Sequence, residues 1–134
     1  MRYAILIYDE NTASPAPELP PPDVLQQVMD EYNAYTQMLK NRGAFQAGEA
    51  LEPNPTATTV RIKDGQRITT DGPFAETKEG LGGFYIIEAK DLDEALDYAA
   101  QCPGAKYGGS IEVRPVVDLP ADYAPTAQAA AAAS

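Results

Sequence analysis

The chain has 134 residues, a net charge of −10, no histidine and a single cysteine. This length fits one domain that buries its own core, and the lone cysteine fits a reducing cytoplasm, where we expect the protein. The acidic balance and scattered basic residues argue against nucleic acid or an anionic membrane as a partner, and no apolar stretch approaches the ~18 residues of a membrane span. Because histidine is absent and cysteine unpaired, no metal is expected, and no cofactor is expected either.

The first elements predicted along the chain are a strand, a loop and a helix. Residues 2–8 carry apolar side chains on both faces, which indicates a central strand covered on two sides. A proline-rich loop follows over residues 9–22. Asp23 is expected to cap a helix over residues 23–42, with Gln26 completing a capping-box pattern.

Three further strands are predicted in the middle of the chain. Residues 44–51 form the first of them. Residues 58–63 and 66–71 flank the pair Asp64-Gly65, which is typical of the type I′ turn between two hairpin strands. Residues 83–89 then predict a further strand.

The last elements are a short helix and a strand. Asp91 and Glu94 repeat the capping-box pattern before an amphipathic helix that ends at Cys102-Pro103-Gly104. Residues 110–117 alternate as a final strand. From residue 118 to 134 the periodicity fails, and this Pro/Ala-rich C-terminal tail is expected to be flexible or to lie on a neighbour.

The predicted order is β-α-β-(β-β)-β-α-β over a domain spanning residues 1–117. Without the hairpin this is the split βαβ order of a ferredoxin-like α+β sandwich. Its two helices would cover only one face of a sheet whose central strands are apolar on both sides. We therefore expect a homodimer in which a second copy packs against the free sheet face.

The motif DGPFAETKE at residues 71–79 crowds charged residues behind a Gly-Pro turn, and a glycine-rich stretch follows it. Loops of this kind, anchored by strands, often carry binding or catalytic residues. The glycines of that stretch, Gly80, Gly82 and Gly83, allow close backbone approach to a ligand or partner.

The chain up to residue 117 closely resembles the YCII-related family and, more narrowly, its DGPF branch. The resemblance rests on the DGPFAETKE motif and on residues 2–8, 57–61, 81–85 and 111–115. It implies a bacterial protein that forms a dimeric α+β barrel from ferredoxin-like protomers.

The resemblance leaves two functions open. Many YCII proteins carry a His-Asp pair near a pocket, and a few relatives act on small lactones, but this chain has no histidine and cannot use that pair. One possibility is a pocket near the motif loop for a small, largely neutral or apolar molecule, with or without proton transfer or lactone-type chemistry. The alternative is a non-catalytic regulatory or protein-interaction module, since DGPF proteins are often encoded beside extracytoplasmic-function sigma factors.

Asp71 and Glu76 are the candidate catalytic residues. A carboxylate can act as a general base when burial or a like charge raises its pKa. Alternatively, Asp71 caps its own turn, and Glu76 with Lys78 and Glu79 forms a solvated polar turn.

Six side chains of the loop and the neighbouring strands are candidate ligand-binding groups: Tyr8, Glu49, Phe74, Lys78, Tyr85 and Arg114. The hydroxyls of Tyr8 and Tyr85 could donate to a carbonyl or enolate oxygen, or the rings could serve as interface aromatics. Glu49 and Arg114 could instead form a cross-strand ion pair. Cys102 is interpreted as a small buried hydrophobe.

Overall fold

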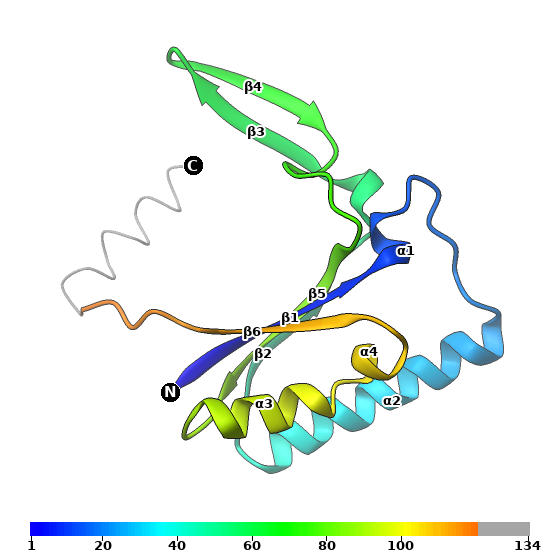
Figure 1. Ribbon diagram of the computed structural model, residues 1–134, viewed down its shortest axis with the longest axis vertical. Coiled ribbons are helices and arrows are strands. Elements are labelled where there is room, and N and C mark those ends of the chain that lie inside the picture. Colours follow the sequence, from blue (N-terminus) through cyan, green and yellow to red (C-terminus); the bar gives the residue numbers. More distant parts are fainter. Residues whose placement is uncertain (121–134) are drawn as a thin grey trace.

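A four-stranded antiparallel sheet forms the centre of the computed structural model, which describes residues 1–120 (Figure 1). The strand order is β2-β5-β1-β6. These strands span Phe45–Ala50 (β2), Gly80–Glu88 (β5), Arg2–Asp9 (β1) and Ser110–Pro115 (β6). The predicted central place of the first strand is confirmed, and this mixed α+β arrangement is compatible with a ferredoxin-like fold.

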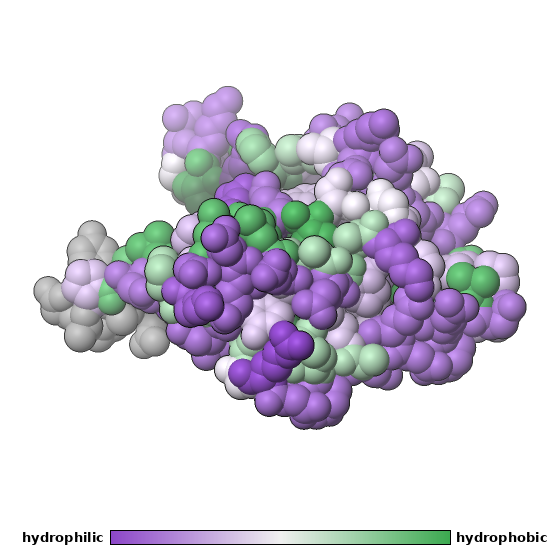
Figure 2. Space-filling model, turned by 60° about the horizontal axis from the view of Figure 1, so that its bottom comes forward, coloured by the Kyte–Doolittle hydropathy of each residue, from purple (hydrophilic) through white to green (hydrophobic). Residues whose placement is uncertain are grey.

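Two helices, α2 (Pro22–Asn41) and α3 (Leu92–Ala100), lie on one face of this sheet. The outer surface on the helix side is mostly hydrophilic with scattered apolar residues (Figure 2). No helix within residues 1–120 is long and apolar enough to cross a membrane.

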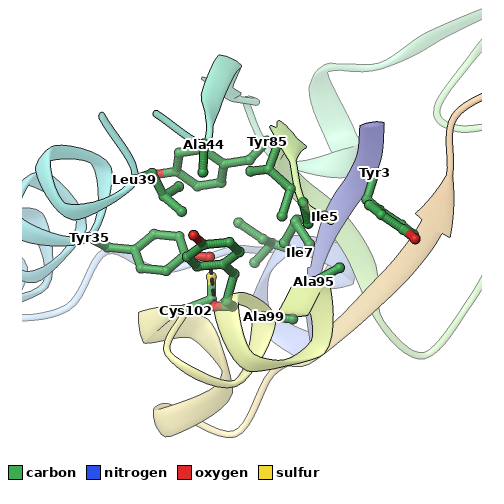
Figure 3. Close-up of a cluster of buried hydrophobic side chains, with 13 residues drawn as sticks. Tyr3, Ile5, Ile7, Tyr35, Leu39, Ala44, Tyr85, Ala95, Ala99 and Cys102 are labelled. Atoms are coloured by element: carbon green, nitrogen blue, oxygen red, sulfur yellow. Dashed lines mark hydrogen bonds between the residues drawn. The ribbon is translucent and has the colours of Figure 1, made fainter. Parts of the chain in front are cut away.

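The core lies between the helices and the sheet (Figure 3). Its largest fully buried side chains are those of Ile5, Leu39, Ile87 and Cys102. Burying a large aliphatic side chain contributes roughly 1.5–3 kcal/mol. The interpretation of Cys102 as a buried hydrophobe is confirmed, because only 1% of this residue is exposed.

Successive side chains of a strand point to opposite faces of the sheet, so the two faces bear different residues. Tyr3, Ile5 and Ile7 point toward the helices and are buried. On the other face, four apolar residues of the central strands are only partly buried: Ala4, Leu6, Phe84 and Ile86. We call this the open sheet face, because no element within residues 1–120 covers it.

The two helix starts were predicted with different success. Pro21, not Asp23, is the N-cap residue of α2, and the helix begins at Pro22. The prediction was wrong because proline fits the first helical position, where its missing N–H costs nothing. For α3 the prediction is confirmed, since Oδ1 of Asp91 accepts from the Glu94 N–H at 2.9 Å.

The predicted hairpin is confirmed as a separate two-stranded sheet of β3 (Thr58–Lys63) and β4 (Gln66–Asp71). Asp64 has φ 52° and Gly65 has φ 76°, and a type I′ turn requires positive φ at both positions. The hairpin projects from the side of the sheet away from the helices (Figure 1).

Three short elements lie where loops were expected: α1 (Glu10–Ala13), the 3₁₀-helix η1 (Asn54–Thr56) and α4 (Pro103–Lys106). Strand β5 also begins at Gly80, before the predicted residue 83. Of the predicted C-terminal tail, residues 121–134 lie outside the described residues.

Candidate functional site

A cavity of about 560 Å³ lies between α2 and the β2–β5 side of the sheet. We call it the helix-side cavity. Its lining combines polar groups with aromatic rings, among them Asp9, Thr12, Tyr32, Thr36, Phe45 and Tyr85. A cavity of this volume is within the range of small-molecule sites, which are mostly apolar with a few placed polar groups.

Asp9 is the carboxylate at the end of β1, where it serves as the N-cap residue of α1. Its Oδ1 accepts from the Thr12 N–H at 2.7 Å, and its Oδ2 accepts from the Thr12 hydroxyl at 2.9 Å. Thr12 is only 8% exposed. The two bonds fix the carboxylate and leave lone pairs on both oxygens for a further donor.

Glycines bring the walls of this cavity close together. A Cβ on Gly82 would lie 3.2 Å from both Asp9 Oδ2 and Thr12 Oγ1. A Cβ on Gly83 would lie 2.9 Å from the Glu49 carbonyl oxygen, and one on Gly48 would lie 2.7 Å from the Tyr85 ring. The close approach expected of the glycine-rich stretch is therefore made to atoms of this chain itself.

The tyrosines of the cavity are hydrogen-bond donors and not bases. The Tyr85 hydroxyl lies 2.8 Å from Thr36 Oγ1. Burial raises the pKa of Tyr85, although its hydrogen bond with Thr36 partly opposes the shift. Burial also raises the pKa of Tyr32. Both phenols consequently keep their protons at neutral pH.

The two candidate catalytic residues, Asp71 and Glu76, do lie together, but at a different cavity. They line a space of about 510 Å³ with Asn54 and Thr77, which we call the loop cavity. Asp71 and Glu76 are both exposed. Both carboxylates are therefore open to solvent and not enclosed by the cavity.

The candidate ligand-binding residues are divided among several places. Glu49 and Tyr85 line the helix-side cavity, whereas Tyr8 and Lys78 line a third space of about 510 Å³. Lys78 also lies 3.3 Å from Glu10 Oε1, with 85% of its side chain exposed.

Phe74 and Arg114 lie outside the helix-side cavity. Phe74 is 73% exposed, and the Arg61 guanidinium lies 4.5 Å from the centre of its ring. Arg114 Nε donates to Glu112 Oε1 at 2.8 Å. The expected ion pair between Glu49 and Arg114 is wrong, because β2 and β6 lie at opposite edges of the sheet.

Among the residues of the helix-side cavity that sequence reasoning missed are Asp9, Thr12, Tyr32 and Thr36. The spacing of Asp9 and Thr12 is that of an N-cap and its partner, and this signal could have identified them. Nothing in the sequence distinguishes Tyr32 and Thr36 from other residues on the inner side of a helix. Within residues 1–120, no cluster of three acidic or cysteine side chains could hold a metal ion.

Comparison with known proteins gives three similarities. The YCII-related domain matches residues 1–120. An uncharacterised protein of Rhizobium meliloti (strain 1021) is 38% identical over 117 residues, covering 87% of this chain and 92% of the relative. Among solved structures, 5-chloro-2-hydroxyhydroquinone dehydrochlorinase of Burkholderia phenoliruptrix, in complex with 2,5-dihydroxybenzoquinone, is 22% identical with a TM-score of 0.46. That match covers 89% of this chain and 96% of the dehydrochlorinase.

Proposed function

The chain belongs to the YCII-related family. On that premise, we propose that it is a homodimeric protein of the DGPF branch and that it binds a small, largely neutral molecule in the helix-side cavity. The observation that carries this proposal is the Asp9 carboxylate, fixed by Thr12 at the cavity wall. A fixed acceptor of this kind orients a ligand without losing side-chain entropy on binding.

The lining of the cavity favours a particular ligand class. Phe45 and Tyr85 supply aromatic surface for a flat apolar ring. Asp9 provides an acceptor for a hydroxyl or amine, and its negative charge disfavours anions. We therefore propose a neutral aromatic or cyclic molecule that carries at least one hydrogen-bond donor.

Of the two carboxylates that line the cavity, Asp9 and Glu49, Asp9 is the one held in place by Thr12, and we propose it as the proton acceptor in any reaction at this site. Histidine is absent from the chain, and the Tyr32 and Tyr85 phenols stay protonated. A ligand hydroxyl that donates to Asp9 would already be within the distance that general-base catalysis requires.

The proposed dimer uses the open sheet face. Leu6, Phe84 and Ile86 are apolar and partly exposed there, side by side on paired strands. Covering them with a second copy removes apolar surface from water, and two-fold dimers are the commonest oligomers. A monomer mass in solution at micromolar concentration would contradict this part of the proposal.

Binding is tested by NMR on the ¹⁵N-labelled protein, with phenol and benzyl alcohol as neutral probes and benzoate as the anionic probe. We expect the neutral probes to shift the amide signals of Thr12, Thr36 and Gly83, and benzoate to bind more weakly. Asp9→Asn keeps a good N-cap residue but removes the charge, and should weaken binding of the neutral probes roughly tenfold. The matched control, Asp71→Asn, should leave binding unchanged.

Two results would count against the helix-side cavity. One is a set of shifts centred on Asp71, Glu76 and Thr77, which would favour the loop cavity instead. The other is an Asp9→Asn variant that binds the probes as well as the unmodified protein does.

A second candidate function, a protein-interaction role, is supported by Phe74. This large apolar ring of the motif loop is 73% exposed. Exposed aromatic residues are frequent anchors of protein interfaces. If this role is correct, Phe74→Ala should abolish association with a partner and leave the NMR response to phenol unchanged.

A further inference from the structure

The β3–β4 hairpin has a charge opposite to that of the rest of the chain. Between residues 58 and 71 it contains three basic residues, Arg61, Lys63 and Arg67, and two acidic residues, Asp64 and Asp71. Its charge is therefore +1, and with a total of −10 the remainder of the chain carries −11. The basic residues that were expected to be scattered are thus partly gathered on one projecting element.

The hairpin also exposes apolar side chains that lie outside the hydrophobic core described within residues 1–120. Val60 is 56% exposed and Ile62 is 70% exposed. The register pairs Val60 with Thr69 and Ile62 with Arg67, so all four share one side of the hairpin. A two-stranded hairpin by itself is marginally stable in water, and a covering surface would stabilise it.

The position of the hairpin suggests where that surface comes from. It projects on the side of the sheet away from the helices, which is the side of the open sheet face (Figure 1). A second copy seated on the open sheet face would lie beside the hairpin. In a two-fold dimer the contact is reciprocal, so each hairpin would reach the other protomer.

We propose that the β3–β4 hairpin is an arm that clasps the second copy of this chain. Val60 and Ile62 pack against the body of the partner, and Arg67, on the same side of the hairpin, faces its acidic surface. Arg61 and Lys63 lie on the opposite side and add to the positive charge of the arm. A body with a charge of −11 attracts the arm and repels a second body, so the arm offsets a repulsion that would otherwise oppose dimerisation. This inference rests on the dimer of the proposed function.

The dimer dissociation constant, measured by analytical ultracentrifugation on the full chain, tests the arm. Val60→Ser combined with Ile62→Ser should raise this constant at least about tenfold. The matched control is Leu92→Ser with Leu96→Ser, which removes similarly exposed apolar side chains (48% and 46%) from α3. This control should leave the constant within about twofold, and circular dichroism should show both variants folded.

A charge-reversal variant tests the electrostatic part separately. Lys63→Glu with Arg67→Glu should weaken the dimer at least about tenfold at low salt, with a much smaller effect at about 500 mM salt, where charges are screened. If the unmodified chain forms a dimer and neither arm variant changes its dissociation constant, the arm is refuted and the dimer stands. If the unmodified chain is a monomer, the dimer and the arm are both refuted.

Discussion

The backbone N–H of Thr12 and its hydroxyl donate to the two different carboxylate oxygens of Asp9, at 2.7 and 2.9 Å. The pair joins the end of β1 to the short helix α1 and holds the carboxylate at the wall of the helix-side cavity. Both Asp9 oxygens accept from Thr12, so a small substitution at either Asp9 or Thr12 removes part of this contact.

The Thr12 hydroxyl is expected to contribute to stability. Thr12→Val keeps the backbone N–H bond but removes the hydroxyl bond to Asp9, and should lower the free energy of unfolding by about 1 kcal/mol. Urea denaturation measures this loss. Thr77→Val, at an exposed loop position, should stay within about 0.5 kcal/mol of the unmodified protein. Equal effects of the two substitutions would show that the Asp9–Thr12 pair has no special role.

Adjacent glycines of β5 should respond differently to alanine. The Cβ of Gly83→Ala would meet a backbone carbonyl oxygen at 2.9 Å, which cannot move freely, so we expect a destabilisation of about 1–3 kcal/mol. Gly82→Ala would press on the Asp9 and Thr12 side chains at 3.2 Å, which can give way. This second variant should stay folded and bind phenol more weakly. Thermal unfolding and the NMR titration distinguish the two effects.

Core packing on the helix side predicts a large loss at Leu39, which is fully buried. Leu39→Ala should cost about 2–5 kcal/mol, from lost burial and the cavity that remains. Leu96→Ala makes the same chemical change at a residue that is 46% exposed, and should cost much less. Chemical denaturation of both variants compares them directly, and a similar cost at the two sites would contradict the packing described here.

Stability should fall at alkaline pH. Burial raises the pKa values of Cys102, Tyr32 and Tyr85 in the folded protein. These groups therefore lose their protons more easily in the unfolded chain, whose thiol and phenol pKa values are about 8.5 and about 10. Their contribution is complete below those values and is lost as pH rises above them.

Urea denaturation between about pH 7 and pH 10.5 checks this expectation. Absorbance at the tyrosinate band of the folded protein provides the control, since Tyr32 and Tyr85 should ionise only at higher pH than exposed tyrosines. A free energy of unfolding that stays constant, or rises, across this range would contradict the burial of these groups.

Local sequence signals predicted most of the secondary structure. Asp64-Gly65 specified a type I′ turn because both positions need positive φ, which these residues tolerate. Asp91 capped α3 because the bond it accepts, from Glu94, lies within one turn. Prediction failed at Asp23, where two local signals competed and the proline at the first helical position prevailed.

The sequence by itself determined the order of elements, the hairpin and the likeness of nearly the whole chain to the YCII-related family. Each of these depends on contacts or patterns within a few residues. It singled out Asp71 and Glu76, which do meet at one cavity. Only the tertiary structure decided that Glu49 and Arg114 lie on opposite edges of the sheet, and that Asp9 joins Tyr32, Thr36 and Tyr85 around another cavity. Those relationships depend on strand order and helix packing, which bring together residues that no local signal links.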